Sequence, residues 1–131
     1  LKKLMPNADF IAVSTPLTPA TRGLIDKDKI AAMKPGVIFA DVSRGGVVDQ
    51  RALYDALQTG QIAAAVLDVF ETEPLPETSP LWALENVIIS PHCSSVYAEW
   101  EKASFEIFIK NLGRWMNGEE LINIVNPNRG Y

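Results

Sequence analysis

The chain has 131 residues, of which 47% are hydrophobic and 21% are charged, and its formal net charge is -4 at pH 7. These values are typical of a globular domain with one hydrophobic core. The charges form no basic patch for nucleic acid, no apolar run reaches the ~18 residues of a membrane-spanning helix, and nothing resembles a signal peptide. Cys93 is the only cysteine, which excludes an internal disulfide. We therefore expect a cytoplasmic protein that binds neither nucleic acid nor membranes.

Short apolar runs rich in β-branched residues alternate with segments of helical periodicity. In chain order they predict the end of a helix at 1–8, a strand at 10–14, a helix at 27–33, a strand at 37–42, a helix at 50–59, strands at 62–67 and 86–90, and a long helix at 96–117. Asp26 and Asp49 are suitable N-caps for two of the helices, and Gly60 and Gly118 suit helix ends.

The alternation of strands and helices favours right-handed crossovers and an α/β fold with a doubly wound parallel sheet. Four strands are only part of such a sheet, and the sequence contains no Gly-x-Gly-x-x-Gly, the turn that holds a dinucleotide pyrophosphate. We expect residues 1–95 to form the C-terminal half of a Rossmann-type nucleotide-binding domain. Residues 96–131 are expected to form a long helix and an apolar tail.

Three polar candidates follow the predicted strands: Arg44, an acidic cluster that begins at Asp68, and His92. Ligands gather at the carboxyl edge of a parallel sheet, so these side chains can converge there. A guanidinium grips a carboxylate with two parallel hydrogen bonds, an imidazole donates a proton near neutral pH, and a neighbouring carboxylate favours the protonated imidazole. The reduction of an α-keto acid requires this combination.

Each candidate also has a plainer interpretation. Arg44, Glu71 and Glu77 could be solvated loop charges, and His92, the only histidine, could be structural. Cys93 fits a buried apolar thiol better than a nucleophile, because nothing marks a second base.

Five segments resemble, in order and at compatible spacing, the D-isomer-specific 2-hydroxyacid dehydrogenases, a family that includes phosphoglycerate, D-lactate and glyoxylate/hydroxypyruvate dehydrogenases. The segments are 13–25 (VSTPLTPATRGLI), 33–36 (MKPG), 42–49 (VSRGGVVD), 67–76 (LDVFETEPLP) and 86–92 (NVIISPH). The resemblance covers residues 1 to 95.

By this resemblance, the family's substrate-binding arginine falls on Arg44, its proton-donating histidine on His92, and the glutamate that partners the histidine on Glu73. The family's cofactor contacts fall on Thr15, Pro16, Val42, Ser43, Arg44, Asp68, His92 and Ser94. The implied cofactor is NAD or NADP, and the implied substrate is a small 2-keto or 2-hydroxy acid. The implied reaction is hydride transfer between the nicotinamide and C2 of the acid.

The resemblance also implies an incomplete enzyme. The glycine fingerprint, the acidic residue that chooses NAD or NADP, and the start of the substrate domain should precede Leu1, so the chain is expected to be an inactive fragment. The helix at 96–117 and the tail that ends in Gly130-Tyr131 are similar to the segment that returns to the substrate domain. One alternative is a dinucleotide-sensing protein, because transcriptional co-repressors share this fold and these motifs. Another is a free-standing half-domain that acts only as an assembly module.

Two apolar surfaces predict a homodimer. In the doubly wound order, the strand at 10–14 has a free edge, which invites pairing with another chain. The long helix carries Trp100, Phe105, Phe108 and Trp115 without the domain on which they would pack. A two-fold dimer is the simplest closed solution, unless the long helix folds back over its own sheet.

Overall fold

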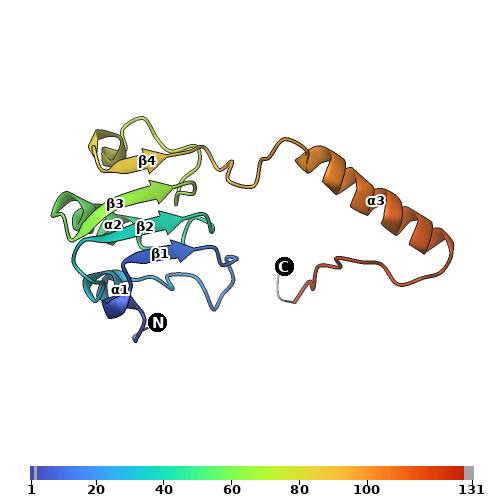
Figure 1. Cartoon of the computed structure of the whole chain (residues 1–131), viewed down its shortest axis with the longest axis horizontal. Helices are drawn as coiled ribbons and strands as arrows, with labels where there is room; N and C mark the ends of the chain where they lie inside the picture. The colour runs from blue at the N-terminus through green and yellow to red at the C-terminus, as the bar shows by residue number, and fades with distance from the viewer. Residues whose placement is uncertain (2, 129–131) are drawn as a thin grey trace. The chain divides into compact units, whose positions relative to one another are not determined.

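The computed structural model describes residues 1 and 3–128. The chain divides into two compact units, Leu1–Ser94 and Ser95–Tyr131. The elements are η1 (Met5–Asn7), β1 (Phe10–Val13), α1 (Lys27–Ala31), β2 (Val37–Asp41), α2 (Gln50–Gln58), β3 (Ile62–Leu67), η2 (Pro80–Ala83), β4 (Val87–Ile89) and α3 (Trp100–Met116) (Figure 1). All four predicted strands are present. The predicted helix end at 1–8 is only a 3-10 turn, and the long helix begins at Trp100 instead of residue 96.

The first unit is built on a four-stranded sheet in the order β1-β2-β3-β4, with every pair parallel. This confirms the predicted α/β class with a parallel sheet. The helix caps also follow the sequence prediction. The Asp26 carboxylate accepts a hydrogen bond from the main-chain N–H of Lys29, and the Asp49 carboxylate accepts one from Ala52. Each bond satisfies one of the free N–H groups of a first helical turn.

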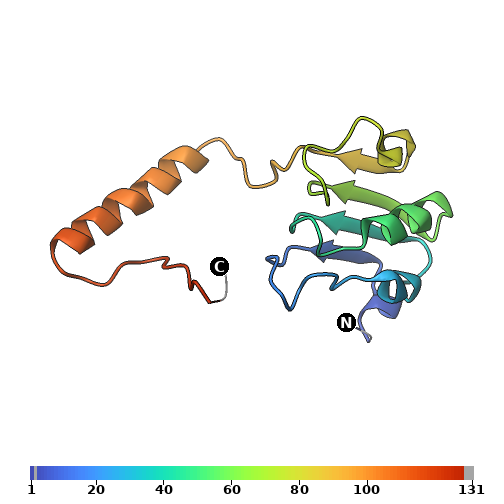
Figure 2. The same cartoon turned by 180° about the vertical axis from the view of Figure 1, so that it is seen from behind.

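Helices α1 and α2 cover one face of the sheet, and the core of the unit lies beneath them (Figure 2). Alternate residues of β2 point into this core, where Val37 is 1% exposed and Phe39 is fully buried. Ile62 and Leu67 of β3 and Leu53 of α2 complete its centre. The period-2 burial fixes the register of the sheet, because a one-residue slip would turn this apolar set outward.

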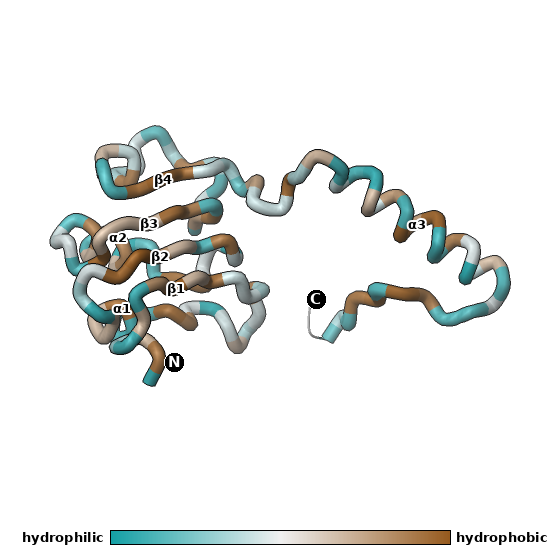
Figure 3. Tube along the Cα trace, in the orientation of Figure 1, coloured by the Kyte–Doolittle hydropathy of each residue, from teal (hydrophilic) through white to brown (hydrophobic). Residues whose placement is uncertain are grey.

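The opposite face of the sheet is apolar but open within the first unit. Phe10 of β1, Ile38 of β2, Val66 of β3 and Ile88 of β4 are 73%, 38%, 38% and 66% exposed. Apolar residues therefore line the strands on both faces. Brown segments mark apolar residues along β2 and β4 in Figure 3. A doubly wound sheet normally carries helices on both faces.

The second unit consists of α3 and the tail that follows it. None of the residues of α3 is buried, and its exposed large apolar residues are Trp100, Phe105, Phe108, Ile109, Leu112, Trp115 and Met116. The Asn111 side chain ties the tail to the helix, because its amide accepts a hydrogen bond from the Ile122 N–H and donates one to the Ile122 carbonyl. The expected role of Gly130-Tyr131 lies outside the described residues. No helix of the described residues is long and apolar enough to cross a membrane.

Candidate active site

The carboxyl ends of all four strands meet at one edge of the sheet, since the strands run in the same direction. The loop that carries Arg44 leaves β2 at this edge, the loop that carries Glu73 leaves β3, and His92 lies just beyond β4. The first two loops touch at Gly45. A Cβ added there would lie 2.6 Å from the carbonyl carbon of Phe70 and 3.1 Å from the Glu71 nitrogen. Only glycine therefore permits this close approach of the two backbones.

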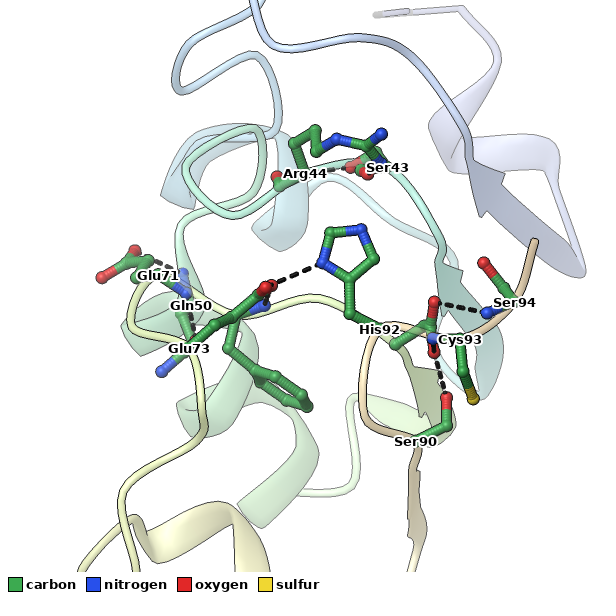
Figure 4. Close-up of polar contacts among 11 residues, drawn as sticks. Ser43, Arg44, Gln50, Glu71, Glu73, Ser90, His92, Cys93 and Ser94 are labelled. Carbon is green, nitrogen blue, oxygen red and sulfur yellow. Dashed lines mark hydrogen bonds and ion pairs between the residues drawn. The ribbon is translucent and has the colours of Figure 1, made fainter. Parts of the chain in front are cut away.

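His92 and Glu73 form the centre of the site. Nδ1 of His92 lies 2.7 Å from Oε2 of Glu73, and the two side chains are about one-third exposed (Figure 4). The other oxygen, Oε1, accepts a hydrogen bond of 2.9 Å from the Phe70 N–H. The bond from His92 and then the bond from Phe70 lower the pKa of Glu73, so the carboxylate is ionised at neutral pH. When Nδ1–H donates to Glu73, Nε2 of His92 is free to exchange a proton with a ligand.

Arg44 is exposed, and its Nη1 donates a hydrogen bond of 2.7 Å to the Ser43 carbonyl. Its positive charge also contributes to the lowered pKa of Glu73. The structure thus brings Arg44 into the electrostatic neighbourhood of the Glu73–His92 pair. A guanidinium offers five N–H donors, so one main-chain bond leaves capacity to bind a carboxylate.

Asp68 is 1% exposed, and other groups of the protein donate hydrogen bonds to both oxygens of its carboxylate. Oδ1 accepts hydrogen bonds from the Ser90 hydroxyl at 2.5 Å and the Cys93 N–H at 2.8 Å, while Oδ2 accepts one from the Ser94 N–H at 2.9 Å. Burial opposes ionisation of this group, but these bonds together outweigh burial and hold the pKa of Asp68 far below its usual range. Asp68 is therefore a buried anion.

Ser43 is also directed into the protein. It is 2% exposed, and both its hydroxyl and its N–H donate to Oδ1 of Asp41, at 2.5 and 3.0 Å. Burial raises the pKa of Asp41, and the two bonds from Ser43 act in the opposite direction. Asp41 was not among the predicted site residues. Its only sequence signal is a charged residue within an otherwise apolar strand.

The remaining predicted contacts lie at the same edge of the sheet. Thr15 and Pro16 follow β1, Val42 follows β2, and Ser94 is exposed beyond His92. The Thr15 hydroxyl donates to the Pro16 carbonyl at 3.2 Å. In the described part of the chain, no hydrogen bond joins these four residues to the Glu73–His92 pair. The structure thus shows their location but not a shared contact.

A clasp between Gln50 and Glu71 was also missed from the sequence. The Gln50 N–H donates to Oε1 of Glu71 at 3.2 Å, and the Glu71 N–H donates to Oε1 of Gln50 at 3.1 Å. Glu71 is an exposed loop charge, as its sequence context favoured, but it also makes these two bonds to Gln50. The two bonds link the start of α2 to the loop after β3, beside the close approach at Gly45.

An open pocket with a volume of about 590 Å³ adjoins the Glu73–His92 pair. Its remaining walls are mostly apolar and include Phe70, Leu75, Trp82 and Ile89. The indole N–H of Trp82 donates to the Pro76 carbonyl at 3.0 Å, which leaves the ring face available to line the pocket. The charged pair thus lies at the side of an apolar cavity, a common arrangement for small-molecule sites.

Comparison with known protein families identifies the first unit of the chain. The sequence model described as "D-isomer specific 2-hydroxyacid dehydrogenase, NAD binding domain" matches residues 1–94. The chain belongs to this family. The expectation of NAD or NADP as the cofactor is therefore confirmed at the level of the family.

Curated 2-hydroxyacid dehydrogenases match nearly the whole chain. It is 44% identical over 129 residues to D-3-phosphoglycerate dehydrogenase of Methanocaldococcus jannaschii. This alignment covers 98% of this chain and 24% of that protein. It is 44% identical over 126 residues to glyoxylate reductase of Korarchaeum cryptofilum. This alignment covers 96% of this chain and 38% of that protein. The chain thus spans well under half the length of these relatives.

Solved structures of the family share the fold. A D-isomer specific 2-hydroxyacid dehydrogenase from Xanthobacter autotrophicus Py2, in complex with NADPH and MES, has 43% identity and a TM-score of 0.91, covering 100% of this chain and 53% of that chain. An NADPH-dependent glyoxylate/hydroxypyruvate reductase from Sinorhizobium meliloti, in complex with NADP and sulfate, has 29% identity and a TM-score of 0.90, covering 99% and 42%.

Proposed function

We propose that the chain is part of an NAD(P)-dependent oxidoreductase that interconverts small D-2-hydroxy acids and 2-keto acids. The observation that carries the proposal is the 2.7 Å contact between His92 and Glu73, with Arg44 close enough to lower the pKa of the same carboxylate. Family membership supports the reaction class. An acid–base imidazole and a carboxylate-binding guanidinium are the two protein groups that this chemistry requires.

The proposed roles are those that the family resemblance implies, and the contact between His92 and Glu73 supports two of them. Nε2 of His92 gives its proton to the C2 oxygen during reduction and takes it back during oxidation. Glu73 fixes the orientation of the ring through Nδ1. Arg44 binds the substrate carboxylate with parallel N–H donors and orients the carbonyl carbon. When bound, the nicotinamide dinucleotide supplies or accepts the hydride.

The residues present fit one half of such a cofactor. We propose contacts to its nicotinamide half from Thr15, Pro16, Val42, Ser43, Arg44, Asp68, His92 and Ser94. Two of these residues, Ser43 and Asp68, are 2% and 1% exposed, and their side chains are hydrogen-bonded within the protein. The sequence has no glycine fingerprint for the pyrophosphate, so we propose that the 131-residue chain alone is inactive and that turnover belongs to the longer parent enzyme.

The proposal extends to organisation and partners. Residues 96–131 would return to the substrate domain of the parent enzyme, which works in the cytoplasm with a soluble dinucleotide. The chain would associate as a homodimer through the free edge of β1, where Phe10 is 73% exposed, or through the exposed aromatic residues of α3.

The test is turnover by the parent enzyme with glyoxylate or hydroxypyruvate and NADH or NADPH, followed by the loss of nicotinamide absorbance. We expect turnover, and we expect His92→Gln to lower kcat by roughly 10²–10⁴-fold, because it removes the general acid. Dinucleotide binding without turnover of any 2-keto acid would instead favour the sensor interpretation. If His92→Gln turned over like the wild type, the assignment of the proton donor would be wrong.

A further inference from the structure

The conformation of His92 is unusual for its residue type. Its φ is +53°, in the left-handed region that non-glycine residues seldom adopt. Such a conformation persists only where the surrounding structure determines it. The contact with Glu73 cannot do so alone, because it acts on the ring and leaves the main chain free to turn.

Asp68 supplies the missing constraint. Its carboxylate accepts the Ser90 hydroxyl, two residues before the histidine, and the Cys93 and Ser94 N–H groups, directly after it. Pro91 has no N–H to contribute. One buried anion therefore holds the chain on both sides of His92.

Asp68 is itself firmly placed. It follows β3, its N–H donates to the Asp41 carbonyl at 2.9 Å, and it is 1% exposed. A buried ion requires compensating donors, and the three from the histidine loop are those that the structure provides. The carboxylate and the loop around His92 therefore stabilise each other.

We propose that Asp68 is a positioning residue, whose buried carboxylate holds His92 in the left-handed conformation that directs its imidazole to Glu73. This role differs from the cofactor contact that family resemblance implies for the Asp68 side chain. The kinetic part of the proposal rests on the proposed dehydrogenase function. The conformational part does not.

The key variant is Asp68→Asn, which has the same shape. Oδ1 accepts two donors and Oδ2 accepts one, so the new amide NH2 must face at least one N–H or hydroxyl donor, whichever way it is turned. The loop must then move. Ser90→Ala is the milder variant, because it removes one donor and keeps the anion and both main-chain bonds. Asp49→Asn is the matched control, since Asn is an equally good N-cap.

The first measurement uses the parent enzyme. We expect Asp68→Asn to lower kcat by about 10²-fold, as for a misplaced reacting group, with an unchanged dissociation constant for the dinucleotide. Ser90→Ala should show a smaller loss of the same kind, and Asp49→Asn none. Weaker dinucleotide binding at full kcat would overturn the proposal in favour of a cofactor contact. If Asp68→Asn does not fold, an unchanged kcat in Ser90→Ala would overturn it.

The second measurement needs no turnover. His92 is the only histidine, so the ring-nitrogen NMR signals of a histidine-labelled chain report on it alone. Glu73→Gln defines the signal when the charged partner is lost. We expect Asp68→Asn to move the His92 signals toward those of Glu73→Gln, and Asp49→Asn to leave them in place. Wild-type signals in folded Asp68→Asn would contradict the proposal. Absence of turnover in the wild-type parent, with the expected NMR shifts, would contradict only the dehydrogenase function.

Discussion

Gly45→Ala tests whether contact between two loops sets the geometry of the site. The added Cβ would lie 2.6 Å from the Phe70 carbonyl carbon, and closer still to its oxygen, whereas ordinary contact begins near 3.4 Å. Both obstructing atoms belong to the backbone and cannot rotate away. The Arg44 loop and the Glu73 loop must therefore separate by at least about 0.8 Å at this point.

The expected cost has two parts. Overpacking of this kind destabilises proteins by about 1–3 kcal/mol, which urea unfolding of the chain would measure. A displacement approaching 1 Å between the groups that orient a substrate can cost about 10²-fold in rate. We therefore expect Gly45→Ala to lower kcat/KM of the parent enzyme strongly, with a raised KM for the keto acid because Arg44 moves.

Gly60→Ala is the matched control. Gly60 has a φ of +76°, and nothing lies within 4 Å of an added Cβ. Alanine there costs about 1–2 kcal/mol of backbone strain at the end of α2, without moving either loop. Similar losses of unfolding free energy in Gly45→Ala and Gly60→Ala, with a loss of kcat/KM only in Gly45→Ala, would support the reasoning. Wild-type kinetics in Gly45→Ala, or the same kinetic loss in Gly60→Ala, would refute it.

Three further predictions follow from other parts of the structure. Arg44→Lys should raise the KM for the keto acid more than it lowers kcat, because a bidentate fork becomes a point charge; equal KM values in steady-state kinetics would contradict the assignment. The folded-state pKa of Asp68 lies below its unfolded value, so its charge stabilises the fold above about pH 4 and this stabilisation is lost as the pH falls further. Asp68→Asn should therefore flatten the acid side of a plot of unfolding free energy against pH, and parallel curves would show that the charge does not matter. Sedimentation equilibrium should show a dimer that Phe10→Lys dissociates, and a wild-type species of 14.4 kDa would exclude it.

The fold was largely predictable from the sequence, because its signals are local. Proline and glycine bound the strands, β-branched residues fill them, and Asp26 and Asp49 mark helix starts by the side-chain bonds they make. The long helix was predicted too early because the apolar Val96 fits its period. In the structure the helix starts at Trp100, after a Glu99 that makes no capping bond.

The supports of the candidate site were not predictable, because they join residues far apart in sequence. The Gln50–Glu71 clasp spans 21 residues, and the bond from Ser90 to Asp68 spans 22. Periodicity also cannot tell which face of a sheet is covered when both are apolar. In β1, for example, Val13 is 5% exposed, whereas Phe10 of the same strand is open to solvent.

Arg44, Glu73 and His92 all emerge from one contiguous run of strands, β2 to β4, in a unit with its own core. If they act as proposed, the residue that binds the carboxylate and the two that transfer the proton lie in one unit. No glycine-rich turn for the pyrophosphate forms part of this sequence. A substitution that moves one strand of this unit would then disturb carboxylate binding and proton transfer together.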